Sequence, residues 1–181
     1  RDFKKLGKPR LFFAVTAGAM DSMVNHYTAN LRLRSNDAYT AGGKAGFRPD
    51  RTIDTYTQIL KKLYPHTPVV VGGIEASLRR LTHYDYWSDK LRSSILETSG
   101  ADLLVYGMGD KPIREVAKAM RNGFNLKLLR GLRQVGFMAD KEYVERLYNG
   151  NTIVLNSYEE CLQDKQKFGK NFVEIEILSN M

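Results

Sequence analysis

The chain has 181 residues, 43% of them hydrophobic, which is enough to bury one core in a single domain or slightly more. No apolar run approaches the roughly 20 residues of a membrane span, and residues 1–8 lack the apolar segment of a signal peptide, so we expect a cytoplasmic protein with no membrane partner. Lys and Arg exceed Asp and Glu by 28 to 20, and the resulting net charge of +8 favours phosphate-bearing partners.

Three apolar runs that end on small residues have the pattern of strands buried on both faces. They are PRLFFAVTAG (Pro9–Gly18), TPVVVGG (Thr67–Gly73) and ADLLVYGMG (Ala101–Gly109). A predicted helix follows each of them, so the chain reads strand, helix, strand, helix, strand, helix. This order predicts an α/β fold with an open, mainly parallel sheet, helices on both faces and right-handed crossovers, a Rossmann-like three-layer sandwich.

The three predicted helices have recognisable ends. DRTIDTYTQILKKLYP has apolar residues at helical spacing, with Asp50 as its cap and Pro65 as its stop. DYWSDKLRSSILETSG is predicted to be a helix that ends at Gly100. DKPIREVAKAMRNG is predicted to carry Pro112 in its first turn and to end at Gly123.

The loops after the three strands are where ligands bind in open parallel sheets. They cover residues 16–51, 72–87 and 107–111. The first is far longer than the usual two to six residues of such a connection, so we expect it to be functional or locally folded, with a short helix in MDSMVNHYTANLRL.

Polar residues in these loops predict a substrate site or an interdomain site in one crevice. Buried charges must be paired, so Arg79 or Arg80 is expected to meet Asp21, Glu75 or Asp85. Substrate capture and docking of another domain both stay open, and the aromatic residues beside Asp85 form either a core or a pocket wall. The candidate residues are Asp21, Asn25, His26, Arg48, Gly72, Gly73, Glu75, Arg79, His83, Asp85, Gly107 and Gly109.

Other features predict neither a metal site nor a catalytic residue in this chain. Cys161 is the one cysteine, so it cannot by itself hold an iron–sulfur cluster or a structural zinc. The three histidines are not spaced as metal ligands on one helix, and no Ser/His/Asp or Cys/His arrangement is complete. The GGKAG stretch (Gly42–Gly46) lacks the Gly-Lys-Ser/Thr ending of a phosphate loop and is expected to be a flexible turn.

Basic residues gather between Lys111 and Arg133, where Glu115 is the one acidic residue. Two interpretations stay open, a solvated helix surface and an RNA-binding surface. The candidate nucleic-acid contacts are Arg114, Lys118, Arg121, Lys127, Arg130 and Arg133.

Residues 1–150 are predicted to form the α/β domain, with a last short helix in DKEYVERLYNG. Residues 151–181 are predicted to form a strand, NTIVLNS, and a connector helix, YEECLQDKQKFGK. Ser157 and Glu160 form a capping box for that helix, and Tyr158, Leu162 and Phe168 are expected to form its apolar stripe.

Four stretches together resemble the amino-terminal region of the YgiQ-like family of radical S-adenosylmethionine (SAM) proteins, an uncharacterised bacterial group. They are MDSMVNHYTAN, DAYTAGGKAGFRPDR, GGIEASLRRLTHYDYW and SGADLLVYGMGDKPIREVA, and the resemblance runs from about Lys8 to Leu178. It implies that the full-length protein is a radical SAM enzyme that uses a [4Fe–4S] cluster and SAM, both bound by a C-terminal radical SAM domain that would be the main partner of this chain.

The cluster-binding C-x-x-x-C-x-x-C motif of that family is absent from this sequence, so the chain alone is expected to be an accessory domain and not an enzyme. By the same resemblance, its first strand and helix are expected to be missing. The fold order is also similar to cobalamin-binding domains of related radical SAM enzymes. The D-x-H-x-x-G loop that supplies their axial histidine is absent, so cobalamin is not expected, and RNA stays open as an alternative substrate.

Overall fold

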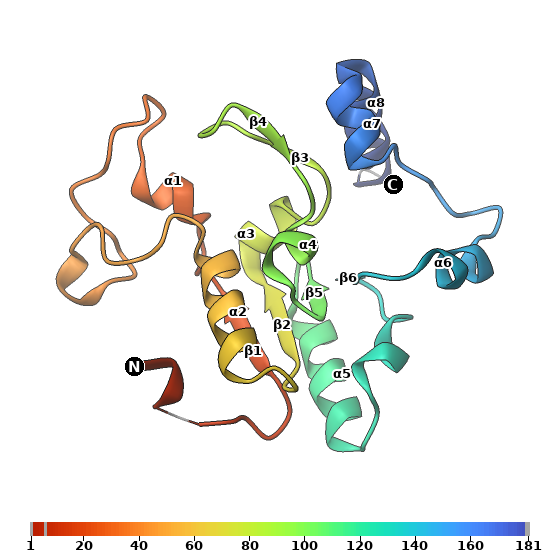
Figure 1. The fold of residues 1–181 in the computed structure, drawn as a ribbon, viewed down its shortest axis with the longest axis horizontal. Helices are drawn as coiled ribbons and strands as arrows, with labels where there is room; N and C mark the ends of the chain where they lie inside the picture. The colour runs from red at the N-terminus through yellow and green to blue at the C-terminus, as the bar shows by residue number, and fades with distance from the viewer. Residues whose placement is uncertain (1, 6, 180–181) are drawn as a thin grey trace. The chain divides into compact units, whose positions relative to one another are not determined.

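The structure is a computed structural model that describes residues 2–5 and 7–179 (Figure 1). The chain forms two compact units, unit 1 with Arg1–Leu81 and Ser94–Met138, and unit 2 with Thr82–Ser93 and Ala139–Met181. None of the helices in the described ranges combines the length and apolar character that a membrane crossing requires.

Unit 1 holds the predicted α/β sheet. Its helices and strands are η1 (Asp2–Lys4), β1 (Phe13–Thr16), α1 (Ser22–His26), η2 (Ala41–Gly43), α2 (Thr52–Leu63), β2 (Val69–Gly72), α3 (Gly73–Leu78), α4 (Ile95–Ser99), β5 (Leu103–Val105), α5 (Asp110–Arg121), η3 (Leu126–Leu129) and β6 (Val135–Gly136).

The sheet has the strand order β1-β2-β5-β6, and its first three strands are parallel. Val15 pairs with Val71, and Val71 pairs with Leu104, so the three apolar runs lie side by side as predicted. The antiparallel edge strand β6, where Val135 pairs with Val105, was not predicted, because its two residues are too few for a sequence pattern. The prediction of an open, mainly parallel sheet is confirmed.

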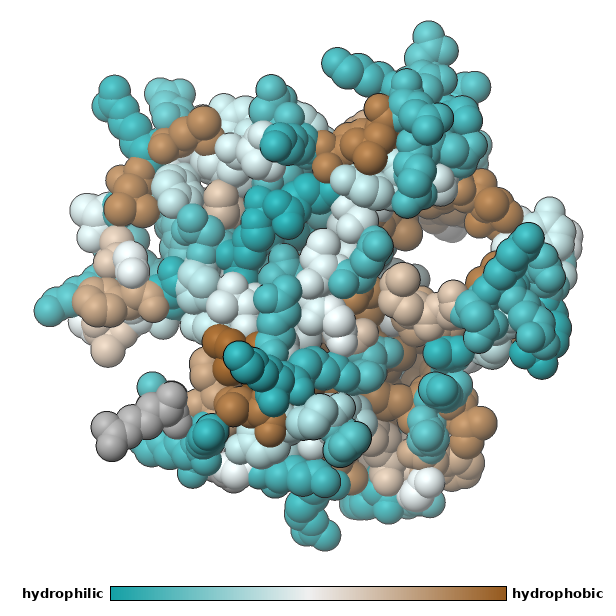
Figure 2. All heavy atoms as spheres, in the orientation of Figure 1, coloured by the Kyte–Doolittle hydropathy of each residue, from teal (hydrophilic) through white to brown (hydrophobic). Residues whose placement is uncertain are grey.

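Two hydrophobic clusters cover the two faces of the sheet. Successive residues of a strand point to opposite faces, so Val71 packs in one cluster with Ile53 of α2, and Val70 packs in the other with Val116 of α5. Figure 1 shows α2 and α5 flanking the strands. The predicted three-layer arrangement is confirmed. On the face drawn in Figure 2, hydrophobic residues form small patches separated by hydrophilic side chains.

The predicted ends of α2 are partly wrong. The helix ends at Leu63, before Pro65, but it begins after Arg51, which makes no side-chain capping bond. Asp50 does not cap it, because its carboxylate bonds to His26 and Tyr27 instead.

The helix predicted in DYWSDKLRSSILETSG is also wrong for most of its length. Only Ile95–Ser99 is helical (α4), with Gly100 as its left-handed C-cap. The preceding residues form a hairpin in unit 2, with strand β3 (His83–Asp85) antiparallel to β4 (Lys90–Arg92). Asp89 adopts a positive φ of 51° in the turn and accepts a hydrogen bond from Tyr84, which favours a hairpin over a helix.

Unit 2 also contains α6 (Lys141–Leu147), α7 (Tyr158–Gln163) and α8 (Lys165–Ser179). The capping box of Ser157 and Glu160 is confirmed. The strand predicted in NTIVLNS is absent from the described residues, and the side chain of Asn171 instead accepts the Asn156 N–H at 2.8 Å. The predicted connector helix breaks at Asp164, so Tyr158 and Leu162 lie in α7 and Phe168 lies in α8, and the three do not form a stripe on one helix.

Candidate functional site

Glu75 is the centre of a buried polar cluster at the carboxyl ends of β1 and β2. Its side chain is fully buried. One carboxylate oxygen accepts the Ser22 N–H at 2.9 Å and the Ser22 hydroxyl, and the other accepts the Ile53 N–H at 3.2 Å. Ser22 opens α1 and Ile53 lies in the first turn of α2, so Glu75 satisfies amino-terminal N–H groups of two helices.

Arg79 supplies the positive charge of this cluster. Its guanidinium lies 2.8 Å from the Asp21 carboxylate and 3.4 Å from that of Glu75. Asp21 also caps α1 by accepting the Met23 N–H at 2.9 Å. The predicted pairing of Arg79 with Asp21 and Glu75 is therefore confirmed. Arg80 does not join them, because it donates to the Ser77 carbonyl oxygen at 2.6 Å.

Asp37 is the centre of a second buried cluster, within the long loop between β1 and α2. It accepts hydrogen bonds from the Asn25 amide at 2.7 Å, the Arg48 guanidinium at 2.8 Å and the Tyr39 N–H at 2.9 Å. Burial alone would raise the pKa of Asp37, but the bonds from Arg48, Tyr39 and Asn25 and the charge of Arg48 outweigh it, so this pKa lies well below its ordinary value.

His26 joins the second cluster to the base of the loop. Its ring nitrogens lie 3.2 Å from the Asp37 carboxylate and 3.0 Å from that of Asp50. Arg48 also donates to the Ala17 carbonyl oxygen at 3.1 Å, which fixes the loop to the end of β1.

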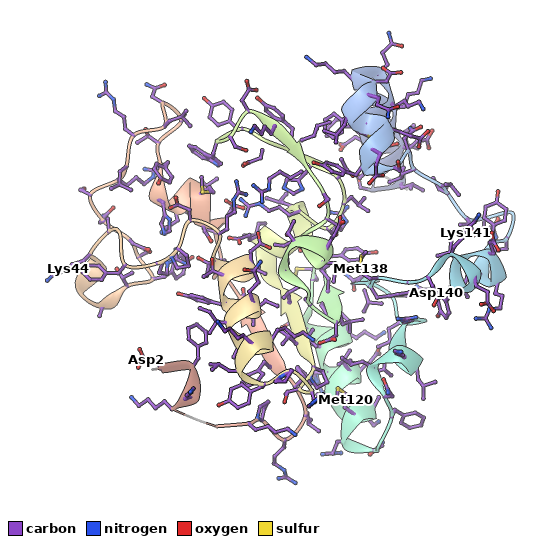
Figure 3. All side chains as sticks on the ribbon, viewed as in Figure 1. Asp2, Lys44, Met120, Met138, Asp140 and Lys141 are labelled. Carbon is purple, nitrogen blue, oxygen red and sulfur yellow. The ribbon has the colours of Figure 1, made fainter. Side chains whose placement is uncertain are left out.

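These contacts define how the long loop is built. Asp21, Asn25, His26, Arg48 and Glu75 all direct their polar atoms at protein partners, so they hold the loop in place. Figure 3 shows Lys44 on the outer turn of the loop, which agrees with a turn in the GGKAG stretch.

Two candidate residues, His83 and Asp85, belong to the hairpin of unit 2. Asp85 is 3% exposed and accepts a hydrogen bond from the Ser88 hydroxyl. Tyr86 and Trp87 pack edge to face, with ring centroids 5.3 Å apart. Within their own unit, these residues stabilise the hairpin and its turn.

The candidate glycines line a crevice of about 330 Å³ in unit 1, at the carboxyl ends of β1, β2 and β5. Gly73 has a φ of +81°, and a Cβ there would lie 2.4 Å from the Thr16 hydroxyl oxygen, so close packing of α3 on β1 requires glycine. Ala14, Thr16 and Asp110 line the same crevice and were not predicted. The position of Asp110 directly after the third strand was the signal that could have found it. The candidate glycines in the lining are Gly72, Gly73, Gly107 and Gly109.

The basic candidates separate into two groups in the structure. Arg114, Lys118 and Arg121 lie along α5, where together with Lys111 they line a hollow of about 750 Å³. The remaining candidates lie beyond α5: Lys127 and Arg130 line a different hollow, and Arg133 lines neither.

The residues of this chain do not fit an iron–sulfur cluster. Among residues 2–5 and 7–179, no three His, Cys, Asp or Glu side chains are grouped so that they could hold a metal ion. Cys161 is buried in unit 2 and accepts a hydrogen bond from the Asn171 amide at 3.4 Å, and burial raises the pKa of its thiol. The described lining of the glycine crevice includes no histidine that could serve as an axial ligand of cobalamin.

Comparisons with known proteins give a consistent result. A family model described as Radical SAM N-terminal matches residues 1–181. A UPF0313 protein from Porphyromonas gingivalis is 56% identical, over 99% of this chain and 28% of the relative. One from Bacteroides thetaiotaomicron is 53% identical, over 99% of this chain and 30% of the relative. The chain thus spans less than a third of these curated relatives, and no solved structure matches it significantly.

Replacing the central carboxylate tests the first cluster. Glu75→Gln should lower the free energy of unfolding by about 3–5 kcal/mol, because Arg79 loses a buried countercharge and the amide turns a donor toward other donors. Urea denaturation followed by circular dichroism measures the change. The matched control Glu145→Gln removes an exposed carboxylate on α6 and should cost less than about 0.5 kcal/mol. Equal losses in the two variants would contradict a structural role for Glu75.

The second cluster makes stability depend on pH. Because the pKa of Asp37 is lowered on folding, its contribution is complete above its ordinary value of 3.8 and is lost as the pH falls toward the folded pKa. Asp37→Asn should therefore be less stable than the parent by about 3–5 kcal/mol at pH 7, and the difference should shrink below about pH 4. Urea denaturation at pH 7, 5, 4 and 3 measures this. A difference that stays constant down to pH 3 would refute the assignment.

Proposed function

The chain belongs to the Radical SAM N-terminal family, and on that premise we propose that it is the accessory part of a radical SAM, [4Fe–4S]-dependent enzyme, where it helps to bind the substrate. The predicted resemblance to the YgiQ-like family is confirmed by the family match and by the two relatives. The reaction, and the binding of cluster and SAM by a C-terminal domain, belong to the proposal. Bound there, these groups would supply the radical that attacks the substrate.

The glycine crevice carries the proposal. It opens at the carboxyl ends of three parallel strands, which is the usual ligand position in this class of sheet. Its volume of about 330 Å³ lies at the lower end of the range of small-molecule sites. The crevice is lined by strand ends and by the residues that directly follow them, and the clusters of Glu75 and Asp37 fix the loop that follows β1, so the site would be preformed.

This chain's own residues would bind and orient the substrate. Ala14 and Thr16 are exposed at the crevice, and Asp110 provides a carboxylate that can accept hydrogen bonds. The buried carboxylates of Asp21, Asp37 and Glu75 already accept several protein donors each, so they would act by positioning the loop.

Filling the crevice in the full-length protein tests the proposal. After anaerobic reconstitution, the parent protein should cleave SAM to 5′-deoxyadenosine, and one fraction of a cell extract that contains the substrate should stimulate this cleavage. In Ala14→Leu the added side chain occupies the crevice, so the stimulation should disappear. The matched control Ala41→Leu, in the outer turn of the long loop, should keep it.

Three outcomes decide between the possible roles. A reconstituted parent that forms no 5′-deoxyadenosine would overturn the proposal. Full stimulation of Ala14→Leu would show that the crevice does not bind the substrate. If Ala14→Leu loses SAM cleavage even without extract, the result would instead favour domain docking, in which this end of the sheet contacts the catalytic domain.

RNA binding is a second candidate function, favoured by one observation. Lys111, Arg114, Lys118 and Arg121 are exposed and line one hollow, where they could contact phosphates. In the full-length protein, bulk tRNA should be retained in filter binding at low salt, and its affinity should fall steeply as salt rises. Arg114→Glu should make the salt dependence shallower, and Lys62→Glu, on the other face of the sheet, should not. No retention at low salt would exclude RNA.

A further inference from the structure

We infer that the glycine crevice and the basic hollow along α5 form one continuous site for a nucleotide, with the base in the crevice and the phosphate on the helix. This inference rests on the proposed function and names its substrate class, a nucleotide or a molecule that ends in one. Three observations support it: the two cavities share a lining residue, the hollow carries a row of cations, and the crevice is lined mostly by glycine and apolar residues.

The two cavities share a lining residue at the amino end of α5. Asp110 lines both the crevice of about 330 Å³ and the hollow of about 750 Å³. From this point the crevice extends over the sheet to Ala14 and Thr16, and the hollow extends along α5 to Arg121. A single ligand that passes Asp110 can therefore occupy parts of both.

The hollow has the chemistry of a phosphate site, because four cations in its lining outnumber two carboxylates, Asp110 and Glu115. Lys111, Arg114, Lys118 and Arg121 follow one another at intervals of three, four and three residues, which places them on one face of α5. All four are exposed, and within the ranges that the structure describes none of them forms an ion pair. Such a row of cations is suited to charge-assisted hydrogen bonds with phosphate oxygens.

The crevice has a different chemistry and excludes a second anion. Its walls are glycine backbone and the apolar side chains of Val70, Val105 and Ile113. Its one carboxylate, Asp110, also lines the hollow, so it would repel a phosphate toward the cations farther along α5, while it would accept hydrogen bonds from N–H groups. A nucleobase is flat, neutral and bears N–H donors, so it fits this wall while its phosphate lies on α5.

Calorimetric titration of the full-length protein tests the inference with four probes: adenosine 5′-monophosphate, adenosine, inorganic phosphate, and a 5′-phosphorylated oligoribonucleotide. The monophosphate should bind at least about tenfold more tightly than adenosine or phosphate alone, because it engages both cavities. If the oligonucleotide binds more tightly still, the source is an RNA end. If it binds more weakly, the source is a free nucleotide.

Three variants separate the two halves of the site. Ala14→Leu should weaken the monophosphate about tenfold and leave inorganic phosphate within about twofold, since the added side chain fills only the crevice. Arg114→Glu should weaken both probes about tenfold. Lys62→Glu makes the same charge change on α2, across the sheet, and should alter neither.

Several results would overturn the inference. They are equal affinity for adenosine and its monophosphate, loss of phosphate binding in Ala14→Leu, or tight binding of an acidic peptide that competes with the monophosphate. Formation of 5′-deoxyadenosine is measured separately. If a protein cleaves SAM in response to extract but binds no nucleotide, the proposed function stands and this inference fails. If it binds nucleotide but never cleaves SAM, this inference stands and the proposed function fails.

Discussion

The fold of unit 1 depends on one buried ionic contact, that of Arg79 with Asp21 and Glu75. Three charged groups lie in the interior at the carboxyl end of the sheet, where unpaired charges would be prohibitive. They are tolerated because Glu75 also receives N–H groups from α1 and α2, while Asp21 caps α1. The same contact therefore joins α1, α2 and α3, which come from separate parts of the chain.

Because of this contact, the polar residues that follow the strands have a structural role in the protein. Residues such as Asp21, His26 and Glu75 have the composition of an active site, yet in the structure they are saturated by protein partners. The glycine backbone, Asp110 and the cations of α5 are among the surfaces that stay open to a ligand. The groups proposed to recognise a ligand therefore lie at the ends of β1, β2 and β5 and on α5, and the ionic clusters fix the loop between β1 and α2.

Much of the fold of unit 1 and the pairing of Arg79 could be predicted from the sequence, because short stretches of residues carried the pattern. Continuous apolar runs predicted β1, β2 and β5, and the requirement to pair buried charges predicted the partners of Arg79. The wrong predictions concern segments whose structure is decided by contacts with other parts of the chain. The hairpin at His83–Arg92 depends on a turn at Asp89 that no periodicity reveals, and the apolar residues of NTIVLNS have no partner strand in the described part of the chain. Asp50 was predicted to cap α2 from its position, but a histidine 24 residues earlier competes for its carboxylate.

The five-residue helix α1 contributes side chains to both buried clusters, Ser22 to that of Glu75 and Asn25 and His26 to that of Asp37. A movement of α1 that breaks one set of contacts must disturb the other. Local opening of the long loop is therefore expected to be cooperative, with residues 17–51 exchanging their amide protons as a single foldon instead of fraying from the tip. An evolving sequence meets the same restriction, since compensating substitutions would have to arise in both clusters together.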